Sequence, residues 1–80
     1  MRLIPCQSSS LAGIAYEPGS TRFYAQFKDG SVYEYIGGQL TPEIVTDILF
    51  AESQGRVFKN AVQYLAYVKV ESPEELDLHV

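Results

Sequence analysis

Residues 23–36, FYAQFKDGSVYEYI, constrain the fold more than any other stretch of this 80-residue chain. Two runs rich in aromatic and β-branched residues flank Asp29-Gly30, a pair typical of the two-residue type I′ turn of a β-hairpin. A loop of that length would fix the pairing of the two strands and place Tyr24 opposite Tyr35. The segment therefore predicts an antiparallel hairpin with a defined set of side chains on each face.

Side chains alternate along a strand, so this register assigns them to two faces. The first face is almost entirely apolar and carries Phe23, Ala25, Phe27, Val32 and Ile36. The second face is mixed and carries Arg22, Tyr24, Gln26, Lys28, Tyr33 and Tyr35. Glu34 interrupts the apolar face. Either it lies near the margin and reaches solvent or a cation, or a bulge shifts the alternation. We expect the apolar face to be buried and the tyrosine face to be uncovered.

Two further segments add strands. Residues 11–27 predict a hairpin that turns at Pro18-Gly19, where proline presets φ and glycine accepts a positive φ. Residues 64–70 are apolar and β-rich, which predicts a third stretch of sheet.

Helix signals follow the hairpins. Thr41-Pro42 has the residues preferred at a helix N-cap and first position, and apolar spacing continues to Ala51. With Gly55 as the residue after the helix end, the predicted helix covers about 42–54. Ser72-Pro73 begins a short, acidic C-terminal helix by the same reasoning.

These elements predict an α+β fold with a small antiparallel β-sheet built from hairpins. One main α-helix packs on one face, and a short C-terminal helix follows. We expect a single domain over residues 1–80, with a core over about residues 8–70 and an acidic tail over residues 71–80. A sheet with one amphipathic helix must bury one of its faces.

The net charge of −4 is unevenly placed along the chain. Four of the ten acidic residues lie in the tail, and the other six balance the six lysines and arginines. A neutral body argues against strong non-specific binding of nucleic acid, which usually needs a basic surface. One cysteine excludes an internal disulfide, and no apolar run is long enough to span a bilayer, so we expect a cytoplasmic protein without membrane contact.

No pattern of residues predicts catalysis. Cys6 is the single cysteine, and His79 is the single histidine and lies next to the last residue. These two residues do not predict a catalytic nucleophile paired with a base, and they do not predict a zinc site. We expect a non-enzymatic protein without a cofactor or metal.

Several motifs together resemble the KTSC domain. They are Ser9-Ser10, the strand Ile14 to Glu17, the F-x-x-G-x-V-Y-x-Y hairpin from Phe27 to Tyr35, and a stretch from Ala51 to Asn60 that is similar to A-x-S-x-G-x-F/Y-F-N. In this last stretch Lys59 separates Phe58 from Asn60, where the family usually has F-N. This ordered set spans about residues 8–70. The family is named for the C-terminus of some lysyl-tRNA synthetases and also occurs as free-standing bacterial or phage proteins. The family's strand near the C-terminus is often rich in arginine, whereas this chain has only Lys69 there.

RNA binding is suspected for the KTSC family, whose function is not established, and the residues of the mixed face suggest a way to achieve it. Tyrosines on a sheet can stack on the bases of RNA or single-stranded nucleic acid while nearby cations contact phosphates. The candidate binding residues are Tyr24, Tyr33, Tyr35, Arg22, Lys28, Arg56, Lys59 and Lys69. The alternative is a protein-interaction module or small inhibitor that uses the same tyrosines for a protein partner or for self-association as a homo-oligomer.

Overall fold

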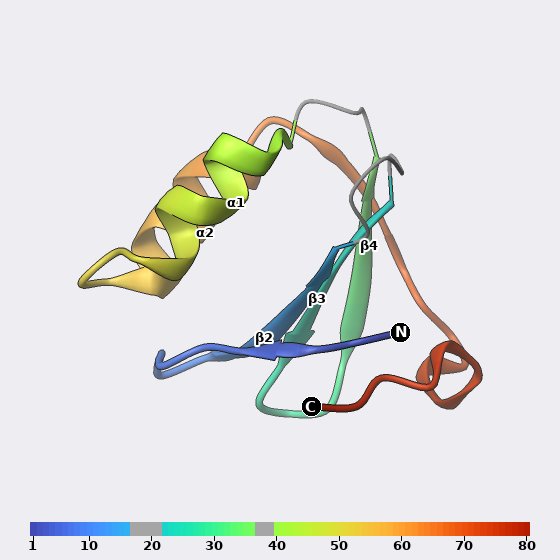
Figure 1. Ribbon diagram of the computed structural model, residues 1–80. Helices are drawn as coiled ribbons and strands as arrows, with labels where there is room; N and C mark the ends of the chain where they lie inside the picture. Colours follow the sequence, from blue (N-terminus) through green and yellow to red (C-terminus); the bar gives the residue numbers. More distant parts are fainter. Residues whose placement is uncertain (17–21, 37–39) are drawn as a thin grey trace.

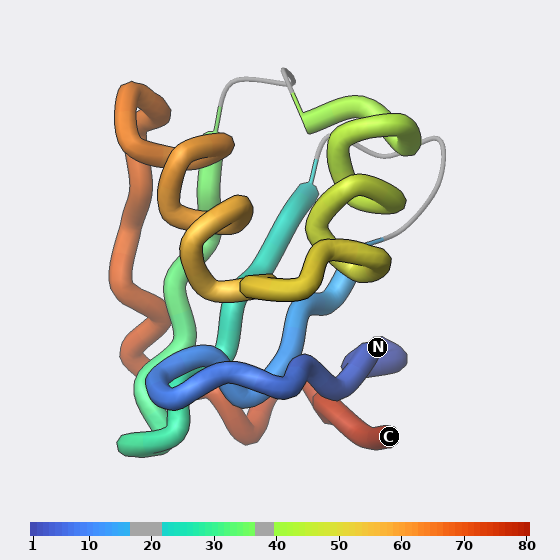
Figure 2. Tube along the Cα trace, turned by 90° about the vertical axis from the view of Figure 1, so that its left-hand side faces the viewer, coloured from blue at the N-terminus to red at the C-terminus, as the bar shows by residue number. Residues whose placement is uncertain are grey.

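The computed structural model describes residues 1–16, 22–36 and 40–80. Five antiparallel strands lie side by side in chain order: β1 (Ile4–Pro5), β2 (Leu11–Tyr16), β3 (Phe23–Phe27), β4 (Val32–Ile36) and β5 (Ala66–Lys69). Two helices, α1 (Pro42–Leu49) and α2 (Gln54–Val62), lie together on one side of the open sheet (Figures 1 and 2). The C-terminal segment, with the 3-10 helix η1 (Pro73–Leu76), lies on the other side. The predicted α+β class is confirmed.

Helix α1 begins as the sequence predicts but ends earlier. The Thr41 hydroxyl accepts a hydrogen bond from the Ile44 amide at 3.3 Å, and Pro42 occupies the first helical position. The helix ends at Leu49, and a second helix starts at Gln54. Interpreting Gly55 as the residue after a single helix is therefore wrong, because it lies in the first turn of α2.

The β3–β4 hairpin turns through three residues instead of two. The Phe27 amide donates to the Ser31 carbonyl, and the Gly30 amide donates to the Phe27 carbonyl, both at 2.9 Å. Gly30 has a φ of 93°, a conformation that glycine adopts without strain. This geometry is that of a type I turn followed by a glycine bulge. The predicted two-residue turn is wrong by one residue.

That extra residue moves every β4 side chain to the opposite face. Tyr35 pairs with Phe23, and Glu34 pairs with Tyr24. Tyr33 and Tyr35 therefore share the helix-covered face with Phe23. Glu34 leaves the apolar face, so the second explanation for it, a bulge that shifts the alternation, is the correct one.

The main core lies between the helices and the sheet. Phe23 and Ala25 of β3 pack with Ile48 of α1 and with Phe58 and Val62 of α2. The prediction that the helix covers the face with Phe23, Ala25 and Phe27 is confirmed. The prediction that Val32 and Ile36 share this face is wrong, since Val32 is buried on the other side and Ile36 is 48% exposed.

A smaller cluster buries the second face of the sheet. It contains Leu3, Ala15, Tyr24 and Val32, and the partly buried side chains of Met1, Val70, Leu76 and Leu78 pack against it. The Leu3 amide donates to the His79 carbonyl at 2.7 Å, which ties the C-terminal segment to the start of the chain. The acidic segment thus contributes leucines to the core.

The expected uncovered tyrosine face does not exist. Tyr24 is 4% exposed on the second face, and Tyr35 is 9% exposed under α2. The two side chains are also not a cross-strand pair, because Tyr24 lies opposite Glu34 and Ala15.

The remaining strands agree in part with those predicted from the sequence. Strand β5 confirms the strand predicted over residues 64–70, whereas no pattern in residues 1–10 predicts β1. The predicted turn at Pro18-Gly19 lies outside the described residues. Neither α1 nor α2 is long and apolar enough to cross a bilayer, and the rest of the described chain contains no such helix.

The second cluster leads to a test of stability. Tyr24→Ala should lower the free energy of unfolding by about 3 kcal/mol or more, because a large buried side chain is lost. Tyr64→Ala is the matched control: Tyr64 is 91% exposed, and its loss should change stability by less than about 0.5 kcal/mol. Urea denaturation followed by circular dichroism measures both. Equal effects would contradict the burial of Tyr24.

Candidate functional site

The serine-rich segment before β2 is held beside the tip of the β3–β4 hairpin. The Lys28 amide donates to the Ser10 carbonyl at 2.8 Å. Within the segment, the Ser8 hydroxyl accepts hydrogen bonds from the Ser10 and Leu11 amides, each at 3.3 Å. The serine residues therefore form an ordered wall at one end of the sheet.

The first turn of α2 closes on this segment from the other side. A side chain at Gly55 would place its Cβ 2.6 Å from the Ser8 hydroxyl oxygen, so any larger residue would require the Ser8 hydroxyl to move. The Gln54 side chain accepts a hydrogen bond from the Gln7 amide and donates one to the Leu49 carbonyl at 2.8 Å. One glutamine thus links the serine segment, the α1 end and α2.

Three adjoining hollows meet at Ser10 and form what we call the serine groove. The hollow on the hairpin side, about 500 Å³, is lined by Phe27, Lys28 and Tyr33 among others. The hollow on the α2 side, about 560 Å³, is polar and shares Ser9 and Ser10 with the first. Each volume falls in the range of about 300–1,000 Å³ that is usual for small-ligand sites.

Three cationic side chains line the serine groove, and a fourth is paired with one of its lining residues. Arg56 and Lys59 line the α2 side, and Lys28 lines the hairpin side. Lys69 lies opposite Tyr33 across the β4–β5 pair. Only Asp29 and Glu52 add negative charge among the lining residues, so the groove is locally more basic than the chain as a whole.

A row of aromatic rings crosses the helix-covered face and reaches the groove. Phe27 and Tyr33 meet edge to face with ring centroids 5.7 Å apart, and Tyr33 meets Tyr67 at the same separation. Phe58 stands 6.2 Å from Phe27 and belongs to the core. Tyr67 is 62% exposed, so the row emerges from the core onto the surface at β5.

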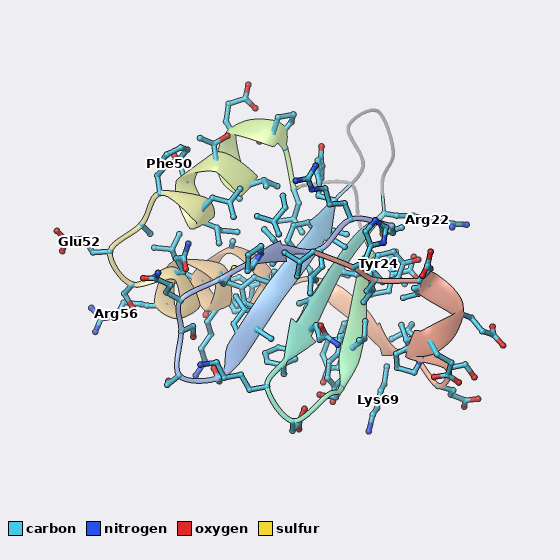
Figure 3. All side chains as sticks on the ribbon, turned by 60° about the horizontal axis from the view of Figure 1, so that its bottom comes forward. Arg22, Tyr24, Phe50, Glu52, Arg56 and Lys69 are labelled. Carbon is cyan, nitrogen blue, oxygen red and sulfur yellow. The ribbon has the colours of Figure 1, made fainter. Side chains whose placement is uncertain are left out.

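The structure brings some of the predicted site residues together and separates others. Tyr33, Lys28, Arg56 and Lys59 line the serine groove, and Lys69 is beside it. Tyr35 also reaches a hollow but is almost fully buried, and Tyr24 lies on the opposite face of the sheet. Arg22 precedes β3, whereas Lys28 follows it, so the two cations lie at opposite ends of the strand. Figure 3 shows Arg22 and Arg56 extending from opposite sides of the molecule.

The site also contains residues that the hairpin pattern does not predict. Ser9 and Ser10 lie at the centre of the groove, Gly55 permits its closure, and Tyr67 extends its aromatic row. Two of the family motifs point to these residues: the Ser9-Ser10 motif, and the stretch from Ala51 to Asn60 that contains Ser53 and Gly55.

The surroundings of three side chains shift their pKa values. Hydrogen bonds from the Ser31 hydroxyl and amide, at 2.6 and 2.9 Å, lower the pKa of the Asp29 carboxyl. Burial raises the pKa of the Cys6 thiol and, together with the neighbouring Tyr33 and Tyr67, that of the Tyr35 hydroxyl. Asp29 is therefore ionised at neutral pH, while Cys6 is a weak nucleophile.

Metal ligands are not clustered in the described part of the chain. No group of three histidine, cysteine, aspartate or glutamate side chains there is arranged to hold an ion. Cys6 is buried near β1, and the His79 ring contacts the Asp77 carbonyl at 2.9 Å.

Comparison with known proteins covers the segments from which the groove is built. The model of the KTSC domain family matches residues 7–71, which include the serine segment, the hairpin and α2. The chain belongs to the KTSC domain family. A protein of Stutzerimonas stutzeri is 32% identical over 73 residues, which cover 89% of this chain and all of that protein.

Two further relatives are similar over most of the KTSC domain. A protein of Tsukamurella paurometabola is 32% identical over 59 residues, or 74% of this chain and 85% of its own length. The crystal structure of a KTSC domain protein from Yersinia pestis matches with a TM-score of 0.68 and 28% identity. That match covers 85% of this chain and 94% of the other.

The closure of the groove can be tested at Gly55. In the wild type, Gly55→Ala should disturb Ser8 and the two amides bonded to it, which offsets the better helix propensity of alanine. In a Ser8→Ala background the same change should be more favourable by about 1 kcal/mol. Urea denaturation of the four proteins gives this coupling. Equal effects of Gly55→Ala in both backgrounds would contradict the contact.

Proposed function

We propose that this KTSC domain binds single-stranded nucleic acid, with RNA as its first ligand, in the serine groove and without catalysis. The observation that carries the proposal is the meeting of three cations, two aromatic rings and the serine segment at one groove. Cations attract phosphates, and aromatic faces accept bases of any sequence by stacking.

The two ends of the groove suit different parts of a nucleotide. Arg56 and Lys59 face the serine segment, where hydroxyl and amide groups can also hydrogen-bond a phosphate. Tyr33 and Tyr67 lie toward the hairpin and β5. Lys28 lines the same hollow as Tyr33, and Lys69 is paired with Tyr33 across β4 and β5. A single strand laid across the groove would therefore meet phosphate contacts at both ends and a stacking surface between them.

Charge placement supports the same ligand. The acidic C-terminal segment packs over the second face of the sheet, away from the helix-covered face on which the aromatic row lies. The charge that an approaching strand meets at the groove is thus set by Lys28, Arg56, Lys59 and Lys69 more than by the net charge of −4.

A protein partner is the second candidate, and exposed apolar side chains favour it. Phe50 is 85% exposed, Tyr64 is 91% exposed and Val68 is 54% exposed. Interfaces with proteins are enriched in such aromatic residues. Binding of this kind would depend far less on salt than binding to phosphates.

The test is salt-dependent binding of a fluorescently labelled, mixed-sequence RNA single strand. Three or four phosphate contacts should give a slope of roughly −2 to −3 for log affinity against log salt. Lys59→Gln should reduce the slope by about 0.7 and weaken binding. Tyr33→Leu should also weaken binding, since it removes one stacking surface while an apolar side chain still packs on Phe27.

Arg22→Gln is the matched control, because it removes one positive charge at the other end of β3. It should leave the slope close to that of the wild type. Loss of binding equal to that of Lys59→Gln, or no binding of the wild type at low salt, would contradict the proposal. Binding that survives high salt would favour the protein partner.

A further inference from the structure

Strand β5 forms an exposed edge of the sheet. All four of its residues, Ala66–Lys69, are exposed, and β4 is its one neighbour in the strand order. Figure 2 shows β5, in orange, as the outermost strand on its side of the sheet. An edge strand carries backbone groups that can pair with a further strand.

The pairing with β4 shows which groups are available. The Val70 amide donates to the Val32 carbonyl at 2.9 Å, so Val70 directs its backbone groups toward β4. Direction alternates along a strand, and Val68 and Ala66 therefore also bond toward β4. The amides and carbonyls of Tyr67 and Lys69 point to the open edge.

The opposite edge of the sheet is closed to such pairing. Strand β1 has only two residues, and one of them is Pro5, which lacks an amide hydrogen. Beside it, a parallel bridge joins Arg2 to His79, so the C-terminal segment already occupies part of that edge. Within the described residues, β5 is the edge strand that is long enough and sufficiently unpaired to bind another strand.

We propose that β5 pairs antiparallel with β5 of a second copy, around a two-fold axis at Val68. In this register Tyr67 lies opposite Lys69 of the second copy. The outward amides and carbonyls of both residues are then used in both copies, which gives four hydrogen bonds. Tyr67 and Lys69 lie one residue to either side of Val68, so a two-fold axis at Val68 places each of them opposite the other in the second copy. The same edge can therefore pair with itself.

Charge selects this register over its neighbour. A shift of the axis to Lys69 would put two lysines directly opposite each other, which is destabilising. The axis at Val68 instead puts each Lys69 beside the ring of Tyr67, where a cation and an aromatic face attract. Each chain therefore supplies the favourable neighbour for the other's charge.

Apolar contacts fall in the same register on the other face of the sheet. Val68, 54% exposed in the single chain, meets Val68 of the second copy, and Ala66 meets Val70 of the second copy. The pairing covers apolar side chains that β4 and the helices leave in water. A contact of this size is small, so the dimer should be weak and dependent on protein concentration.

Analytical ultracentrifugation over a range of protein concentrations tests the dimer directly. The wild type should shift from monomer to dimer as the concentration rises. Val68→Lys and Val68→Glu should each raise the dissociation constant by at least about tenfold, because like charges meet at the axis. An equimolar mixture of the two variants should recover a dimer, since opposite charges then meet. Circular dichroism confirms that each variant is folded.

Engineered disulfides test the register. Val68→Cys should give a covalent dimer on mild oxidation, because the two side chains face each other in a non-hydrogen-bonded pair. Lys69→Cys is the matched control, and its thiols would be too far apart across the axis to join. The native Cys6 is buried and should not cross-link.

Either set of results can overturn the inference. A wild type that remains monomeric at every concentration, or charged variants that dimerise as the wild type does, would show that β5 is not the contact. Cross-linking of Lys69→Cys as fast as Val68→Cys would show that the register is wrong. None of these outcomes depends on whether the serine groove binds nucleic acid.

Discussion

The position of one glycine decides which side of the sheet each β4 residue occupies. Gly30 closes the hairpin as the third residue of its loop, with a φ of 93°. Asp29 accepts two hydrogen bonds from Ser31 and so fixes the turn in this form. Through that turn Tyr33 and Tyr35 come to lie under and beside α2, where they continue the row of rings from Phe23. Both the main core and the aromatic wall of the groove depend on this geometry.

The short chain buries both faces of its sheet by different means. Two amphipathic helices cover one face with Ile48, Phe58 and Val62. The other face has no helix pair over it, and the two ends of the chain cover Tyr24 and Val32 with a few leucines. A small domain has little core, so closing the second face with its ends raises the fraction of apolar surface removed from water. The acidic residues of the C-terminal segment remain in solvent.

Local patterns in the sequence predict the elements well and the register poorly. Alternation and turn residues identify β2, β3 and β4, and the Thr41-Pro42 signal identifies the start of α1. The Asp29-Gly30 pair predicts a two-residue turn, but a three-residue turn also uses a glycine with positive φ, so the local pattern does not distinguish the two. That single choice reversed the faces of Tyr33 and Tyr35, and only Glu34, charged on an expected apolar face, signalled the error.

The groove was less predictable than the strands, for a different reason. Its parts come from segments far apart in the chain: Ser10, Lys28 and Lys59 each lie on a different element or loop. Gly55 reads as a helix end in a local pattern, whereas its role is to let Ser8 approach. Such a contact depends on tertiary packing, which no spacing rule within the helix can indicate.

The open edge and the groove are compatible because they use different directions of the same sheet. Strands added at β5 extend the sheet in its own plane and leave the helix-covered face unobstructed. In an antiparallel pair, residues directly opposite each other lie on the same face, so Tyr67 and Lys69 of both copies would face the same side. The aromatic row that begins at Phe27 and Tyr33 would then continue through Tyr67 toward the second copy. A pair of grooves on one continuous face could hold one long single strand at two places, and such linked binding strengthens two contacts that are each weak alone.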